Sequence, residues 1–227
     1  MRIVFLIPLL FLFTCCKKEK LNSYVVSQGS GVYDIDSNFY KTVKIGETEW
    51  MAENLRVSSL NNGQKITEAI KKTDLKDNQD IPMFTYYNFD STFNTIYGKL
   101  YNQKIVYSGV CPTGWHVPKE DEWLALIEGF GGEKYAGRAL KEVGLIHWNS
   151  PNEKVTNETM LSFKGGGFFN FDGEFEGLKT NTAWWAEKTK YTIEFSPWAF
   201  KLENNSDRLQ GFYQSWSSAL YIRCKKD

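Results

Sequence analysis

The sequence offers few residues that could carry out catalysis. Its two histidines, His116 and His147, each stand beside a tryptophan, and neither has a cysteine or a second histidine at metal-ligand spacing. We predict that His116 is a hydrogen-bonded structural residue. The stretch "GLIHWNSPN" looks like an exposed loop, so His147 stays a candidate ligand-binding residue. The sequence has no G-x-S-x-G, H-E-x-x-H or P-loop motif, and we predict no catalytic residue, no metal site and no cofactor.

Acidic residues at short spacing suggest two further kinds of site. Asp34, Asp36 and Asn38 have the D-x-D-x-N spacing with which a calcium loop begins, but the later glycine and bidentate glutamate are missing. A turn between two strands, in which these side chains accept backbone hydrogen bonds, is the favoured interpretation. For Glu174 and Glu176, a solvated hairpin is favoured over a glycosidase pair.

The N-terminus indicates export. In "MRIVFLIPLLFLFTCCKKEK", Arg2 precedes an apolar run that is shorter than the roughly 20 residues of a membrane-spanning helix. The residues before the two cysteines resemble the lipobox of bacterial lipoproteins, in which a cysteine is diacylated and becomes the new N-terminus. The resemblance implies a signal peptide over 1–15, a polar tether over 16–23 and lipidation of Cys16, with Cys15 as the alternative residue. It also implies anchoring in the outer membrane, on the periplasmic or the cell-surface side; a plain signal peptide with incidental cysteines is the competing interpretation.

Two cysteines, Cys111 and Cys224, remain for the exported domain. An exported pair with no third partner predicts a disulfide, and two free buried thiols are the alternative. The bridge would close a loop of about 110 residues and would stabilise the fold by about 4 to 5 kcal/mol in the chain-entropy account. It would attach the C-terminus to the middle of the domain.

Eight tryptophans are many for a chain of 227 residues. A tryptophan face stacks on sugar rings as well as it packs in a core, although core packing is the commoner fate. Exposure of two or more together would therefore mark a binding site. The candidate ligand-binding tryptophans, which stand in polar, loop-like stretches, are Trp184, Trp185, Trp198 and Trp216.

Elements expected in the first half are strands followed by two helices. Alternating runs from residue 24 predict strands, and the polar segment 61–82 predicts a long surface excursion. The clearest helix follows Pro118, because apolar residues recur there with helical spacing, at Trp123, Leu126, Ile127 and Phe130. A second, shorter helix is predicted over 135–143.

The second half of the chain has little helical periodicity. After His147 it is rich in asparagine, glycine and aromatic residues, and it closes on "SALYIRC", which predicts an alternating strand. We therefore predict an α+β fold, with small antiparallel sheets, two helices and a long loop-rich second half. The chain carries 27 basic and 27 acidic residues and no polybasic arm, so we predict no nucleic-acid partner.

Four stretches together resemble the Fibrobacter succinogenes major paralogous domain, which is common in Bacteroidetes lipoproteins. They are "DIDSNFYKTVKIGETEWMAENLRV", "YGKLYN", "CPTGWHVPKEDEW" and "YIRCKKD". The resemblance implies one domain over 24–227 and, more loosely, a C-type-lectin-like architecture. Two departures stand out. Lys119 replaces the usual serine helix cap, at a cost of about 1 kcal/mol, and "TNTAWWAEKTKYTIEFSPW" differs from the usual "WWSST"-like pattern.

These patterns lead us to expect a lipid-anchored cell-envelope protein that binds glycan or another extracellular polymer without catalysis. Its expected partners are the membrane, through the N-terminal lipid, and a glycan or a surface protein. The alternative is a structural or protein-interaction subunit of the envelope or an appendage. An enzyme related to formylglycine-generating enzymes is less favoured, because those enzymes use reactive cysteines and here both domain cysteines are expected in one bridge.

Overall fold

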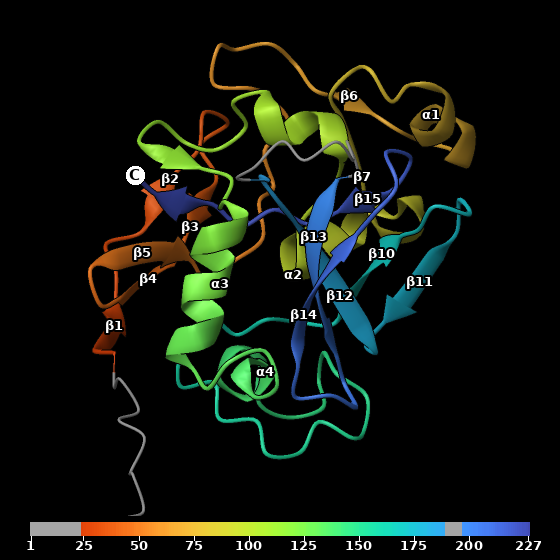
Figure 1. Cartoon of the computed structure of the whole chain (residues 1–227). Helices are drawn as coiled ribbons and strands as arrows, with labels where there is room; N and C mark the ends of the chain where they lie inside the picture. Colours follow the sequence, from red (N-terminus) through yellow and green to blue (C-terminus); the bar gives the residue numbers. More distant parts are fainter. Residues whose placement is uncertain (1–23, 189–196) are drawn as a thin grey trace, which may run out of the picture.

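The structure, a computed structural model, describes residues 24–188 and 197–227. The predicted signal peptide, the tether and the lipidated cysteine lie outside these residues. Two main sheets, one of five strands and one of nine, account for most of the strands, and β2 (Val32–Tyr33) and β3 (Phe39–Tyr40) form a separate pair. Figure 1 shows α3 (Glu120–Gly129) running between two groups of strands. On one side are β4 (Thr42–Ile45) and β5 (Thr48–Met51), and on the other are the long strands β12 (Asn181–Ala186), β13 (Trp198–Glu203) and β14 (Leu209–Tyr213).

The five-stranded sheet contains strands from both ends of the described chain. Its order is β1-β4-β5-β16-β9, and every neighbouring pair is antiparallel. The strands are β1 (Val26–Gln28), β4 (Thr42–Ile45), β5 (Thr48–Met51), β9 (Trp115–His116) and β16 (Lys225–Lys226). The chain turns between β4 and β5 at Gly46, whose φ of 58° favours glycine.

The nine-stranded sheet is mixed. Its order is β14-β13-β12-β10-β15-β8-β7-β6, with β11 attached to β10, and the pairs β6–β7 and β10–β12 are parallel. The strands are β6 (Thr67–Glu68), β7 (Met83–Thr85), β8 (Leu100–Asn102), β10 (Gly166–Phe169), β11 (Phe175–Leu178), β12 (Asn181–Ala186), β13 (Trp198–Glu203), β14 (Leu209–Tyr213) and β15 (Ala219–Leu220). The second half is therefore richer in strands than the sequence predicted, because its aromatic residues pair across strands and fill the core.

The helices are short. The predicted helix after Pro118 is confirmed as α3, and the second helix is confirmed in a shorter form as α4 (Ala136–Leu140). The sequence did not predict α1 (Lys72–Asp77) and α2 (Asn94–Tyr97), nor the 3-10 turns at Tyr87–Phe89, Ser91–Phe93 and Gln103–Tyr107. The segment 61–82 is not entirely a surface excursion, because it contains β6 and α1, and Leu75 of α1 is fully buried.

The start of α3 shows how the chain manages without a serine cap. A lysine side chain carries no acceptor atom, so Lys119 cannot cap the backbone N–H groups of the helix as a serine would. Instead, the Glu122 carboxylate accepts a hydrogen bond from the Lys119 backbone N–H at 2.8 Å. This supplies the reciprocal half of a capping box. Acidic residues also fill the first turn of the helix, where the dipole favours negative charge.

The core is continuous between the two sheets, and Trp123 of α3 connects them. Its ring lies 5.4 Å from Trp50 of β5, 5.3 Å from Phe200 of β13 and 6.2 Å from Trp184 of β12, measured between centroids. All four aromatic side chains are buried. The packing of α3 thus fixes the distance between the two sheets.

The turn at Asp34 confirms the favoured interpretation of the D-x-D-x-N stretch. Asp34 Oδ1 accepts hydrogen bonds from the backbone N–H groups of Asp36 and Asn38, at 3.0 and 2.9 Å. Asp34 Oδ2 accepts from the Asn38 amide and from the Tyr40 hydroxyl. The hairpin of β10 and β11 similarly carries Glu174 and Glu176 as exposed residues, as predicted.

The C-terminal segment joins the two sheets. Residues 219–224 are all buried, although the sequence predicted a strand with one exposed face. β15 pairs with β8 and β10, whereas β16 pairs with β5 and β9. Both faces are covered because the segment crosses from one sheet to the other. Cys224, between β15 and β16, forms the predicted disulfide with Cys111, with Cα atoms 5.9 Å apart.

We predict that replacing Cys111 and Cys224 together by serine lowers the free energy of unfolding by about 4 kcal/mol, because the bridge restricts the unfolded chain over a separation of 113 residues. Denaturant unfolding followed by tryptophan fluorescence measures the loss. Reduction of the parent protein should shift its unfolding curve to that of the double variant. An unchanged midpoint in both experiments would contradict a stabilising role for the bridge.

Candidate functional site

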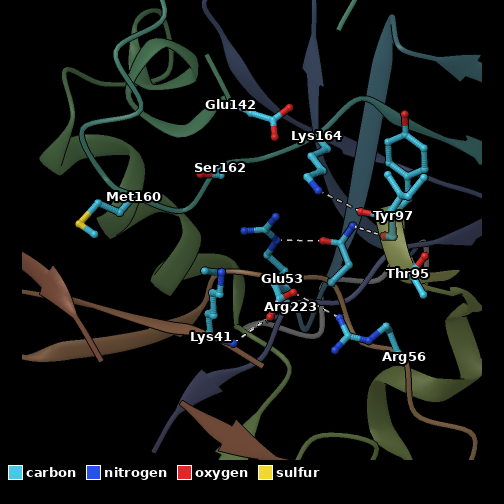
Figure 2. Close-up of a pocket in the computed structure, with 14 residues that line it drawn as sticks. Lys41, Glu53, Arg56, Thr95, Tyr97, Glu142, Met160, Ser162, Lys164 and Arg223 are labelled. Atoms are coloured by element: carbon cyan, nitrogen blue, oxygen red, sulfur yellow. Dashed lines mark hydrogen bonds and ion pairs between the residues drawn. The ribbon is translucent and has the colours of Figure 1, made fainter. Parts of the chain in front are cut away.

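A pocket of about 270 Å³ lies beside the C-terminal segment. Several separate parts of the chain line it: the start of β4, the stretch after β5, α2, the loop between α4 and β10, and the residue before Cys224 (Figure 2). The lining residues include Lys41, Glu53, Asn54, Arg56, Thr95, Ile96, Tyr97, Glu142, Met160, Ser162, Lys164 and Arg223.

Arg223 forms part of the inner wall of the pocket. It is 2% exposed, and its guanidinium lies over the Phe163 ring, 4.0 Å from the centroid. Nε donates to the Asn54 side-chain oxygen at 2.9 Å, and Nη1 donates to the Leu161 carbonyl at 2.6 Å. Burial lowers the pKa of Arg223 to about 9, while the charge of Glu53 acts in the opposite direction. The guanidinium is therefore charged at neutral pH and is held there by neutral oxygen atoms.

Asn54 is the centre of the hydrogen-bond network behind Arg223. Its side-chain oxygen accepts from Arg223 and also from Trp184 Nε1, at 2.8 Å. Its amide nitrogen donates to the Tyr97 carbonyl at 2.7 Å, which fixes the end of α2. Every polar atom of this buried side chain therefore has a partner, so the wall of the pocket is rigid.

The loop between α4 and β10 is held in an unusual backbone conformation. Asn157, Met160 and Ser162 have φ values of 50°, 57° and 50°, in the left-handed region that favours glycine. The Asn157 side chain bonds both the backbone N–H and the hydroxyl of Ser162. Thr159 anchors the loop to the Ala139 carbonyl at 2.7 Å. This conformation costs energy, and it directs the Leu161 carbonyl at Arg223.

Charged side chains surround the mouth of the pocket. Lys164 donates to the Ile96 carbonyl at 3.4 Å. Burial lowers the pKa of Lys164, with Arg223 and Lys41 adding to the effect and Glu142 and Glu53 opposing it. Lys164 thus lies close enough to Arg223 for their positive charges to repel each other.

The two acidic residues of the pocket have basic partners. Glu53 lies 3.4 Å from Arg56 and accepts the Lys41 backbone N–H at 2.8 Å. Glu142 lies 2.7 Å from His147 Nδ1. The charge of Glu53 is thus partly compensated by Arg56, and the Glu142 carboxylate is held by the His147 ring.

The predicted tryptophan site is not formed as expected. Trp184 and Trp185 are fully buried in β12, so neither can stack on a ligand at the surface. They are buried because both faces of β12 are covered; Trp184 packs against Trp123 of α3 and against Phe163. Trp184 nevertheless supports the pocket through Asn54, whereas Trp185 donates to the Tyr101 carbonyl at 2.7 Å.

The other two candidate tryptophans lie outside the pocket. Trp198 is half-buried on β13, 4.8 Å from the Tyr213 ring between centroids, with the Lys188 ammonium 5.2 Å from its own ring. Trp216 is 41% exposed. The four tryptophans therefore do not form one exposed cluster.

The histidines have different surroundings. His147 does not line the pocket, but it orients Glu142, which does, and its ring meets Tyr97 edge-on with centroids 5.6 Å apart. His116 is confirmed as a hydrogen-bonded structural residue: its two nitrogens lie 2.6 Å from Asp227 and 2.8 Å from Glu122. Within residues 24–188 and 197–227, no group of three or more histidine, cysteine or acidic residues is arranged to hold a metal ion.

Sequence reasoning missed Arg223, Asn54 and Lys164 as site residues. A signal was present for Arg223, because it is the one charged residue among the otherwise apolar residues of "ALYIRC". Asn54 lies in "MAENLRV", at the end of one of the stretches that resemble the family. Nothing in the local sequence singles out Lys164.

Comparisons with known proteins identify the family of the chain but no individual related protein. The family model described as the Fibrobacter succinogenes major domain matches residues 43–226. No curated protein and no solved structure matches the chain. The structure itself establishes the α+β class, whereas the looser likeness to C-type lectins stays a prediction. Among the helices of the described residues, none has the length and apolar composition needed to cross a membrane.

We predict that Glu122→Gln destabilises the protein near pH 7 by about 1 to 3 kcal/mol, because charge-assisted hydrogen bonds become neutral ones. Burial alone would raise the pKa of Glu122, but hydrogen bonds from Lys225, the Lys119 backbone and His116 outweigh it and lower the pKa. A lowered pKa in the folded state gives stability above the usual range of a glutamate, which is lost as the pH falls through the lowered value.

The difference in the free energy of unfolding between the parent and Glu122→Gln should therefore become smaller below about pH 4. Denaturant unfolding at a series of pH values measures it. Glu128→Gln, on the exposed side of the same helix, is the matched control and should change little. A difference that is constant from pH 7 to pH 3 would show that the charge of Glu122 does not contribute.

Proposed function

The chain belongs to the Fibrobacter succinogenes major domain family, and we propose that it is a lipid-anchored binding module of the cell envelope. Its ligand is a glycan or another extracellular polymer, and the domain acts without catalysis. The anchor is diacylated Cys16, in the outer membrane. The proposal joins an export signal in the sequence with a polar pocket in the domain.

The pocket around Arg223 is the observation that carries the proposal. Its volume of about 270 Å³ is close to the lower end of the range for small-ligand sites, about 300 Å³. Such a pocket accepts one sugar unit or one substituent of a polymer rather than a long segment. Its wall is rigid because every polar atom of the Asn54 side chain has a partner and Arg223 donates both to Asn54 and to the Leu161 carbonyl, and a preformed site loses little entropy on binding.

The cysteines support binding over the chemistry of formylglycine-generating enzymes. Both domain sulfurs, those of Cys111 and Cys224, are joined in one disulfide. Neither is then available as the thiolate on which such chemistry depends.

A protein-interaction role is the second candidate function, and exposed apolar residues favour it. Val143, Leu145 and Ile146, which follow Glu142 in the chain, are 59%, 58% and 74% exposed. An apolar loop of this kind is suited to contact with a protein surface. The polymer-binding assay below separates the two functions.

We expect the purified domain to bind at least one polysaccharide in a panel of soluble neutral and acidic polymers, tested by affinity electrophoresis. Thr95 lines the pocket and is exposed, so Thr95→Trp should narrow the pocket and weaken binding about tenfold or more. Thr92→Trp, an exposed position just before the same helix and outside the pocket, is the control and should bind like the parent. Absence of binding to every polymer would favour the protein-interaction role.

We expect metabolic labelling with a fatty acid to mark the full chain when it is expressed in a bacterium with lipoprotein processing. Cys16→Ser should abolish the label, because the lipid-bearing thiol is lost, whereas Cys15→Ser should retain it. Mass spectrometry of the mature N-terminus gives an independent measurement. Label that survives in Cys16→Ser and disappears in Cys15→Ser would move the anchor to Cys15; label in neither the parent nor the variants would overturn the anchor.

A further inference from the structure

The pocket is lined by more basic than acidic side chains. Lys41, Lys164 and Arg223 line the pocket, and none of them has a carboxylate within ion-pair distance among residues 24–188 and 197–227. The two carboxylates of the pocket are already engaged, Glu53 by Arg56 and Glu142 by His147. The pocket is lined by two acidic side chains, Glu53 and Glu142, and by four basic ones, Lys41, Arg56, Lys164 and Arg223, so its lining carries a net positive charge.

Arg223 is the member of this group that is hardest to explain by stability alone. A buried cation without a counter-ion is costly, even when neutral oxygens accept its hydrogen bonds. The bonds to Asn54 and Leu161 use Nε and Nη1. Figure 2 shows the guanidinium in the middle of the lining residues, with Lys164 and Lys41 on either side of it in this view. An anion bound there would interact with all three cations.

We propose that the pocket recognises an anionic substituent, a carboxylate, sulfate or phosphate, carried on a sugar ring of the polymer. The inference rests on the proposed polymer-binding function and names the chemistry of its ligand. Ile96 and Met160 line the same pocket and are 43% and 45% exposed. These apolar side chains are placed to contact the C–H face of the ring while the cations hold its charged group.

The backbone of the pocket fits this assignment. Met160 and Ser162 hold positive φ values although neither is glycine, and strained residues of this kind cluster at binding sites. The strained loop presents the Leu161 carbonyl to Arg223 at 2.6 Å and so fixes the orientation of the guanidinium. Bonds that orient a charged group before the ligand arrives raise its affinity for that ligand.

Matched pairs of small sugars test the charge directly. Galacturonate and galactose differ only at C6, where a carboxylate replaces a hydroxymethyl group; glucose 6-sulfate and glucose 6-phosphate are compared with glucose. We expect isothermal titration calorimetry to show at least one acidic sugar binding about tenfold or more tightly than its neutral partner. The acidic sugar that binds best identifies the substituent. Added NaCl should weaken that binding.

Variants assign the binding to the pocket. Lys41→Gln and Lys164→Gln should each weaken binding of the acidic sugar severalfold, and the double variant about tenfold or more. Lys104→Gln, which removes the same charge from an exposed position outside the pocket, should bind like the parent. Arg223→Gln should abolish binding, but because Arg223 is buried, the two lysine variants decide the question if that protein does not fold.

The outcomes separate this inference from the proposed function. Equal binding of acidic and neutral sugars, no binding of any acidic sugar at about 10 mM, or equal losses in Lys104→Gln and Lys164→Gln would overturn the anion site. Polymer binding that is blocked by Thr95→Trp but indifferent to charge would leave the proposed function standing and overturn the anion site. Lysine-dependent binding of an acidic sugar without binding of any polymer would leave the anion site standing and overturn the proposed polymer-binding function.

Discussion

Residues 219–224 are buried on all sides, and this constraint organises the molecule. The segment begins as β15 in the nine-stranded sheet and leads into β16 of the five-stranded sheet. Because one short segment pairs with both sheets, neither sheet is complete until the C-terminus is in place. The disulfide from Cys224 to Cys111 holds the segment at the point where it enters the second sheet. The completion of both sheets therefore depends on the C-terminal segment.

The candidate site is a consequence of the same crossing. A segment that passes from one sheet to another is buried on both faces, so the one charged residue within it, Arg223, must find acceptors inside the protein. Asn54, which follows β5, supplies one acceptor, and the Leu161 carbonyl supplies another. The network extends through Asn54 to Trp184 and Tyr97. The pocket is thus built on the structural core rather than attached to a mobile surface loop.

Charge rather than aromatic stacking dominates the surface of this pocket. Trp184, the expected stacking residue nearest to it, is behind the wall and acts by orienting Asn54. The polar groups that face the pocket include Lys41, Lys164 and Arg223. Basic side chains rather than tryptophan faces therefore line this pocket.

The sequence by itself determined the features that depend on local patterns. The period of Trp123, Leu126 and Ile127 predicted α3, and the Asx residues predicted the turn at Asp34, since both arise from interactions among neighbours in the chain. The pairing of the cysteines followed from their number, and the family followed from quoted motifs that span most of the domain. The α+β class followed from the mixture of helical and alternating patterns.

Tertiary structure alone decided which tryptophans are buried and where the pocket lies. An apolar strand looks the same whether one face or both are covered, and only the packing of other elements on both faces of β12, α3 and Phe163 against Trp184 among them, buried Trp184 and Trp185. Arg223 and Asn54 are 169 residues apart in the chain, yet they share a hydrogen bond. No local pattern encodes such a contact, because it exists only once both sheets have formed and the C-terminal segment has crossed between them.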